Sequence, residues 1–335
     1  MLVLQKANHS GLQKLRMMLD CCDQKILKRS YHRSYFSYLT TMKLPITAII
    51  LTHNEELNIE NCLKSIADWV DEIIVVDSFS TDKTLEIVKK YTDKIHQRKF
   101  VNQAEQFNWA LDSVAIKNDW ILRLDADEMM LPETWNEIEG YFSAESFEVR
   151  PQGSPRSDLI TGFYLKRRVY FMGRWIKHGG YYPAWFLRLW RKDSGRYEER
   201  EMDEHVVLSK GKTVNLKHDF EEHDKKDLSV WIQKHNNYAT REAKAYLNEQ
   251  ENKKTKEQKI REDREGADPE KRRWYKNQFY YKLPPFFRAL LYFKYRYFIR
   301  LGFLDGVPGL IWHFLQGFWY RFLVDAKIYE LRRKK

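Results

Sequence analysis

Two apolar stretches that end in carboxylates decide the fold of this chain: Ile73-Ile74-Val75-Val76-Asp77 and Trp120-Ile121-Leu122-Arg123-Leu124-Asp125-Ala126-Asp127. Each has the length and composition of a buried strand. A carboxylate directly after a buried parallel strand lies at the sheet edge where ligands bind in open α/β folds. Two carboxylates one residue apart, such as Asp125 and Asp127, repel each other unless a cation or protons neutralise them. The pattern predicts a site where a metal ion holds a diphosphate.

Strands and helices alternate around these two stretches. Residues 46–51, 72–76, 94–96 and 120–124 are predicted strands, and apolar residues at helical spacing follow the first three of them. Ser80, Thr81 or Asp82 is available as the cap of the second helix. Such alternation predicts an α/β fold with a mainly parallel sheet and right-handed crossovers.

Composition limits the class of protein. The 335 residues suffice for a full core, and the formal net charge of +11 favours an anionic partner such as nucleic acid, an acidic lipid surface or a phosphorylated substrate. The three cysteines, Cys21, Cys22 and Cys62, do not have the spacing of a disulfide framework or a zinc site, which favours a reducing cytosolic location. The N-terminal residues contain no apolar core of the kind a signal peptide needs.

The sequence divides into four predicted segments. Residues 1–43 are an N-terminal extension, and residues 44–250 are the main domain, with halves at 44–130 and 131–250. Residues 251–278 are a charged linker or helix, which is most simply a solvated segment. Residues 279–335 form the last segment.

This C-terminal segment mixes aromatic and basic residues. Phe286, Phe287 and Phe293 stand among Arg288 and Lys294, and the later apolar run from 310 to 324 is interrupted by polar residues. The composition is typical of amphipathic helices that lie on a membrane interface, and the run is shorter than the roughly 20 apolar residues of a spanning helix. The alternative is that these helices pack back on the catalytic domain or form a dimer interface.

The chain from 46 to 127 resembles the inverting glycosyltransferases of family 2, which have the GT-A fold. The resemblance lies in three motifs: Thr52-His53-Asn54-Glu55 after the first strand, the turn from Val75 to Asp82, and Leu124-Asp125-Ala126-Asp127-Glu128. Later residues resemble the bacterial polysaccharide and lipopolysaccharide-core branch that acts on lipid-linked acceptors.

The resemblance implies that residues 44–130 are the donor half of the domain and residues 131–250 the acceptor half, and it implies a donor site with its cofactor. A divalent cation, Mg²⁺ or Mn²⁺, would be held by Asp127 and Asp125, with His205 as a third ligand or as a residue that orients a carboxylate; His218 and His223 are weaker candidates. The donor is expected to be a nucleotide sugar, most simply a UDP-sugar, with Asp77 reading the base. The implied donor-binding residues are Thr52, Asn54, Glu55, Asp77, Ser80, Arg98, Gln106 and Asp125.

Inverting transfer also needs a carboxylate that accepts the proton of the attacking hydroxyl. The resemblance points to the acidic pair Asp203-Glu204 without choosing between its members. The acceptor loops of the branch correspond to Arg168, Arg174 and Arg188, whose guanidinium groups could contact phosphates of an acceptor or could be ordinary surface charges.

The sequence therefore predicts an inverting glycosyltransferase, peripheral on the cytoplasmic face of the inner membrane, that moves a sugar to a polyprenyl-diphosphate-linked saccharide. A lipopolysaccharide-core glycosyltransferase is the close alternative. A membrane-bound scaffold that keeps the fold without turnover is the alternative of another class. Nucleic acid is not expected as a partner, because the basic residues of the tail stand among bulky apolar ones.

Overall fold

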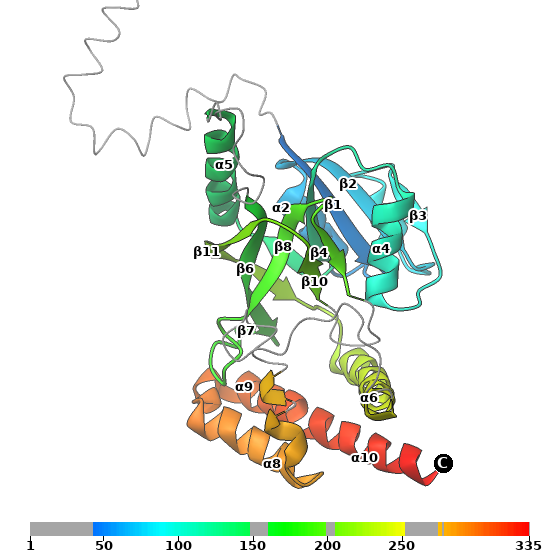
Figure 1. Ribbon diagram of the computed structural model, residues 1–335, viewed down its shortest axis with the longest axis vertical. Helices are drawn as coiled ribbons and strands as arrows, with labels where there is room; N and C mark the ends of the chain where they lie inside the picture. The colour runs from blue at the N-terminus through cyan, green and yellow to red at the C-terminus, as the bar shows by residue number, and fades with distance from the viewer. Residues whose placement is uncertain (1–42, 148–159, 199–204, 252–273, 277, 335) are drawn as a thin grey trace, which may run out of the picture. The chain divides into compact units, whose positions relative to one another are not determined.

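The computed structural model describes residues 43–147, 160–198, 205–251, 274–276 and 278–334. The chain divides into two units, Met1–Lys43 and Leu44–Lys335, of which the second is described here. The second unit contains every element described below (Figure 1). The predicted pair Asp203-Glu204 and the greater part of the predicted charged linker lie outside the described residues.

The donor half is a parallel sheet with helical crossovers, as predicted. Strand β1 lies between β2 and β4 and is parallel to both, and β3 continues the parallel set beyond β2. The elements of this half are β1 (Leu44–Thr52), α2 (Ile59–Ile66), β2 (Val70–Asp77), α3 (Thr84–Val88), β3 (Ile95–Gln97), α4 (Gln103–Ser113), β4 (Trp120–Asp125) and β5 (Glu128–Met130).

The second half extends the same sheet, whose strands lie in the order β3-β2-β1-β4-β8-β6-β11-β5, while β9 and β10 pair in a separate two-stranded sheet. Strand β8 is antiparallel to β4, and β6 is antiparallel to β8, so β6 and β11 run in the direction of β4. The elements are α5 (Pro132–Phe147), β6 (Ile160–Phe171), β7 (Arg174–Trp175), β8 (Trp185–Arg191), β9 (Gly195–Tyr197), β10 (Val206–Leu208) and β11 (Lys212–His223).

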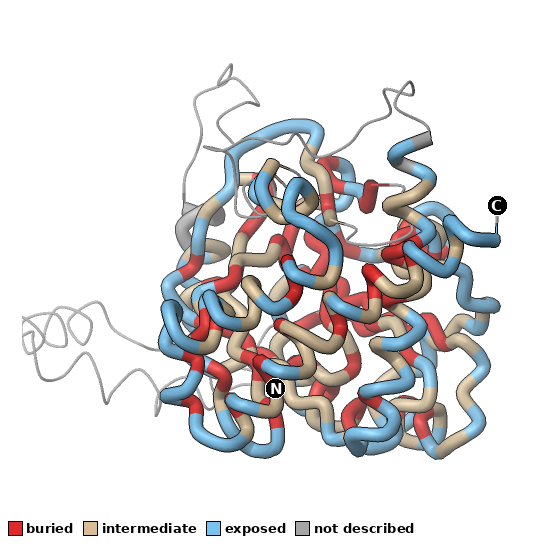
Figure 2. The backbone as a smooth tube through the Cα atoms, turned by 90° about the horizontal axis from the view of Figure 1, so that it is seen from below, coloured by how far each residue is buried: buried red, intermediate tan, exposed pale blue. Residues whose placement is uncertain are grey.

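Each face of the sheet has its own apolar core, because side chains alternate between the faces of a strand. Ile50, Val75 and Leu124 pack with residues of α2 and α5 on one face. Ile49 and Val76 pack on the other face with Phe107 of α4 and with Tyr197 of the β9–β10 hairpin. Figure 2 shows the buried positions gathered inside and the exposed ones along the outside. The two-sided burial explains why the strands of the donor half are almost continuously apolar.

The C-terminal helices pack on the long helix α6 (Leu228–Glu251) and on the end of β6. Trp312 contacts Phe171 and Trp231, and Tyr320 and Val324 of α10 pack against Ala239 and Ala243 of α6. The elements are η3 (Tyr280–Lys282), α8 (Phe287–Lys294), η4 (Tyr295–Ile299), η5 (Gly302–Asp305), α9 (Gly306–Trp312), η6 (His313–Trp319) and α10 (Tyr320–Arg333). One side of this layer therefore packs back on the catalytic domain.

The same layer also carries large exposed apolar residues, among them Phe287, Phe298, Ile299 and Val307. Within the described residues no single helix has the length and apolar character to cross a membrane. One pair, Phe287–Ile299 with Gly302–Arg333, meets those criteria only when both members are taken together, with a bend of 70° between them.

Candidate active site

The loops after β1 and β2 are joined by hydrogen bonds around Asp77. The Asp77 carboxylate is fully buried and accepts from the Thr52 hydroxyl at 3.0 Å, from the Ser80 backbone N–H at 2.9 Å and from the Gln97 amide at 3.2 Å. The Ser80 hydroxyl lies 2.5 Å from Asp77 and accepts from the Asn54 backbone N–H at 2.9 Å. These hydrogen bonds therefore bring together four predicted residues, Thr52, Asn54, Asp77 and Ser80. The Asp77 carboxylate also stabilises the turn that follows it in the chain.

Two residues in these loops have positive φ angles. Asn54 has φ 53° and accepts from the Thr81 backbone N–H at 2.8 Å, whereas Phe79 has φ 59° and is half-exposed. Such backbone is uncommon for residues other than glycine and collects at functional sites. Asp82, one of the three predicted caps, accepts from the Thr84 backbone N–H at 3.0 Å.

Asp125 and Asp127, the acidic pair after β4, have different surroundings. Arg123 donates to both Asp125 carboxylate oxygens at 2.7 and 2.9 Å, and Gln103 donates to Asp125 at 3.0 Å. No hydrogen bond reaches the Asp127 carboxylate from the described parts of the chain, and burial, aided by Glu222, Asp125 and Glu55, raises the pKa of Asp127 to about 8. A carboxylate in this acidic setting without a hydrogen-bonding partner suits a divalent cation.

His223 is the histidine that the structure brings to this pair. Its backbone N–H donates to the Asp127 carbonyl at 2.8 Å, and its ring lies 2.9 Å from Glu221 and stacks on Tyr170. His205 precedes β10, and its backbone N–H donates to Glu198 at 3.2 Å. The described residues contain no group of three or more histidine, cysteine or acidic side chains with the arrangement of a metal site.

Two lysines far along the chain also enter the site. Lys226 lies 2.5 Å from Glu55, and Lys234 of α6 lies 3.9 Å from Asp224, a residue that also accepts from Asn58. Burial lowers the pKa of Lys234, but the surrounding groups, including Tyr238, Asp127 and Asp224, outweigh it and raise the pKa above its ordinary value. No sequence pattern predicts that either lysine lies in the site. The contact of Arg123 with Asp125 could have been predicted, because residues two apart lie on the same face of a strand such as β4.

Arg98 and Gln106, the remaining predicted donor contacts, lie beside the β2 loop. Gln106 is buried and donates to the Ser78 hydroxyl at 3.3 Å, and Arg98 pairs with Glu105 at 2.6 Å.

The three predicted acceptor arginines are in different environments. Arg168 donates to Asp219 at 2.6 Å, and Arg174 is exposed on β7. Arg188 is only 2% exposed and forms an ion pair with Glu128, which is fully buried. A phosphate of an acceptor has no access to a guanidinium at that depth, so Arg188 has a core partner in place of the predicted surface contact.

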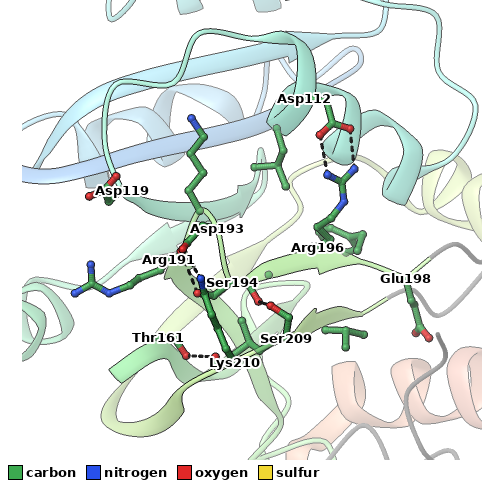
Figure 3. A pocket seen from close by; sticks show the side chains of 16 residues that line it. Asp112, Asp119, Thr161, Arg191, Asp193, Ser194, Arg196, Glu198, Ser209 and Lys210 are labelled. Carbon is green, nitrogen blue, oxygen red and sulfur yellow. Dashed lines mark hydrogen bonds and ion pairs between the residues drawn. The ribbon is translucent and has the colours of Figure 1, made fainter. Parts of the chain in front are cut away.

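A cavity of about 1040 Å³ is lined mainly by residues from the end of β8 through β9 and β10 (Figure 3). Its wall includes Asp119, which precedes β4, whereas Asp125 ends that strand. Two ion pairs lie in its wall, Arg196 with Asp112 at 2.7 Å and Lys210 with Asp193 at 2.5 Å. The candidate active site is therefore the polar edge at the ends of β1, β2 and β4.

Comparison with known proteins shows which proteins the chain is similar to. Residues 47–192 match the model described as Glycosyl transferase family 2. An uncharacterized glycosyltransferase of Rickettsia bellii is 40% identical over 110 residues, which are 33% of this chain and 36% of that protein. The lipopolysaccharide core biosynthesis glycosyltransferase LpsC of Rhizobium meliloti is 26% identical over 297 residues, which are 86% of this chain and 93% of that protein. The chain thus spans about a third of the length of the Rickettsia relative and nearly all of LpsC.

Among solved structures, that of S. aureus TarS 1-349 has a TM-score of 0.37 and 17% identity, covering 88% of this chain and 92% of that chain. The family match over residues 47–192 contains all three motifs on which the predicted resemblance rests, and the observed sheet is the predicted mainly parallel α/β sheet.

Proposed function

We propose that this chain, whose residues 47–192 match the model described as Glycosyl transferase family 2, transfers a sugar from a nucleoside diphosphate donor to a lipid-linked saccharide with inversion at the anomeric carbon. The observation that carries the proposal is the meeting of Asp77, Asp125 and Asp127 at one edge of the sheet within that domain. A diphosphate and its cation need such an edge, which offers oxygen ligands and buried polar anchors side by side.

The donor is proposed to bind between the β1 and β2 loops. Hydrogen bonds hold the side chains of Asp77 and Thr52 in place. Asn54 and Ser80 belong to the same network of polar groups. A binding site whose side chains are already ordered loses little conformational entropy when a ligand binds. A UDP-sugar is the simplest donor, as the sequence predicts.

Asp127 and Asp125, with His223 beside them, would hold a Mg²⁺ or Mn²⁺ ion. Such a cation neutralises the negative charge that grows on the diphosphate as the sugar leaves. His223 replaces His205 in this proposal because its backbone contacts Asp127 directly.

The transfer itself balances as a single displacement. The acceptor oxygen forms a bond to the anomeric carbon, the bond from that carbon to the diphosphate breaks, and the acceptor proton passes to a carboxylate. Asp203 or Glu204 remains the proposed acceptor of that proton.

Membrane attachment at the cytoplasmic face of the inner membrane is proposed from the exposed apolar side chains of the C-terminal layer.

The test is a screen of nucleotide sugars for diphosphate release in the presence of a polyprenyl-diphosphate saccharide. Asp127→Asn and removal of divalent metal are each expected to lower turnover at least 100-fold. Asp112→Asn is the matched control, because Asp112 is an exposed partner of Arg196 away from the strand ends. Equal turnover in Asp127→Asn and Asp112→Asn would contradict the metal-dependent mechanism.

The second candidate is a lipopolysaccharide-core glycosyltransferase, which the likeness to LpsC favours. The same screen separates the two functions when a lipopolysaccharide-core acceptor is added as a parallel arm. Binding of a nucleotide sugar without turnover on either acceptor would instead support a scaffold.

A further inference from the structure

The hairpin between β6 and β7 ends in an unusual tip. Phe171 pairs with Arg174, so Met172 and Gly173 are the whole turn, with φ angles of 49° and 74°. Two-residue hairpin turns with both φ values positive strongly prefer Asn-Gly, because asparagine tolerates this backbone better than other side chains. Here a methionine occupies the first position and is 53% exposed. The turn therefore holds an apolar side chain in solvent at a conformational cost.

A second exposed apolar surface lies beside this tip. We call it the apolar turn; its exposed side chains are Phe298, Ile299, Leu301, Phe303, Leu304 and Val307. Leu301 also has a left-handed backbone, with φ 60°. The segment after β7 is bonded to the apolar turn, because Asp305 accepts from the His178 backbone N–H at 2.9 Å and the Gly179 backbone N–H donates to the Arg300 carbonyl at 2.9 Å.

A pocket of about 410 Å³ lies between the hairpin and the apolar turn, and cations line it. Across the described residues, Arg174 and Lys177 have no carboxylate partner. By contrast, Arg167 and Arg168, which precede the hairpin tip on β6, are both in ion pairs. The carboxylate in the lining, Asp305, already has a partner in His178, whose ring Nδ1 lies 2.6 Å away. The pocket thus keeps two cations available for an anion.

We propose that the hairpin tip and the apolar turn dock onto an anionic lipid surface, and that a lipid phosphate group enters the pocket between Arg174 and Lys177. Exposed apolar side chains rimmed by unpaired cations match the two layers of a bilayer surface, acyl chains below and phosphates above. The inference deepens the proposed function, on which it rests for the membrane as partner.

Strand direction supports this assignment. Strand β6 runs in the direction of β4, so its carboxyl end, which leads to Met172, lies at the same sheet edge as Asp125. Figure 1 shows β7 reaching toward the C-terminal helices. Docking at this tip would turn the candidate active site toward the membrane.

The test is co-sedimentation of the full chain with vesicles made of equal parts phosphatidylglycerol and phosphatidylcholine. Wild type is expected to bind these vesicles, and to bind pure phosphatidylcholine much more weakly. Arg174→Gln with Lys177→Gln should weaken binding about 30-fold, about fivefold for each cation removed near an anionic surface. Met172→Asn should weaken it about tenfold through lost apolar burial, and Met172→Leu should bind like wild type.

Two controls separate docking from folding and from bulk charge. Met172→Asn places the preferred residue in the turn, so its melting temperature should equal or exceed that of wild type. Lys89→Gln with Lys90→Gln removes the same charge from exposed positions after α3 and should change binding less than twofold. The inference is overturned if wild type does not bind the mixed vesicles, or if this control weakens binding as much as the pocket variant.

Calorimetric binding of a nucleoside diphosphate in the absence of vesicles keeps this inference distinct from the proposed function. Normal nucleotide binding in a chain that fails to bind vesicles overturns the docking surface alone. Vesicle binding without any nucleotide binding overturns the proposed function and leaves the docking surface standing.

Discussion

Replacing Arg188 by methionine removes the cation beside a fully buried carboxylate. Glu128 is 0% exposed and Arg188 is 2% exposed, and the guanidinium also packs over the rings of Phe186 and Phe220, 5.2 and 5.0 Å from their centroids. Breaking a buried ion pair by removing one member costs about 3 to 5 kcal/mol, since the other charge is left unpaired. Arg188→Met is therefore expected to lower the melting temperature by about 5 to 10 °C.

The loss should depend on pH in a defined direction. Burial is the largest cause that raises the pKa of Glu128 above its ordinary value, and Asp125 adds to it; without Arg188 this rise is larger. A carboxyl whose pKa is higher in the folded state stabilises the fold fully below its unfolded pKa, about 4.3, and that contribution is lost as the pH rises through the folded pKa. The gap between wild type and Arg188→Met should therefore widen from pH 5 to pH 8.

Urea unfolding at both pH values measures this gap. Arg196→Met is the matched control, since its pair with Asp112 is exposed and worth at most about 1 kcal/mol. The double variant Arg188→Met with Glu128→Gln should recover part of the lost stability. The reasoning is refuted if Arg188→Met unfolds like wild type while its turnover falls only through a higher KM for acceptor, because that result would make Arg188 an accessible acceptor contact.

Three further outcomes are expected. Lys234→Gln should weaken binding of a nucleoside diphosphate about 10- to 100-fold in calorimetry by removing a charge-assisted contact, while Lys225→Gln, at an exposed neighbour, should not. Burial lowers the pKa of His235 to about 4, so its contribution to stability is present above pH 6.5 and lost as the pH falls toward 4; His235→Phe should show a shallower decline of the urea midpoint over that window. Glu242→Leu should lower the unfolding free energy by about 3 kcal/mol, because Arg321, 3.0 Å away, loses its buried partner; a change below about 1 kcal/mol would contradict this.

The donor half of the fold was predictable because its signals are local. Apolar runs of strand length mark β2 and β4, and a carboxylate that ends a parallel strand must lie at the same edge as its neighbours. Asp77 and Asp125 consequently lie at matching ends of strands that flank β1, with partners Thr52 and Leu51 in register.

The rest of the site was not predictable because it depends on distant contacts. Lys226 reaches Glu55 across 171 positions of sequence, and nothing near either residue indicates the pairing. Arg188 was expected at the surface, yet its direction is set by the antiparallel register of β8 against β4, which leaves no local pattern. In the C-terminal segment the mixture of aromatic and basic residues indicated an interface, but which side packs on α6 depends on the tertiary fold.

Strand β6 would also fix the distance between the membrane surface and the acidic pair Asp125 and Asp127. Val169 pairs with Glu222, which pairs with Glu128 beside the acidic pair, and Met172 lies three residues farther along the chain. At about 3.3 Å per residue, the acidic pair would stand only about 10 Å above the docked hairpin tip. So short and rigid a spacing would select sugars close to the lipid and leave the far end of a long glycan out of reach.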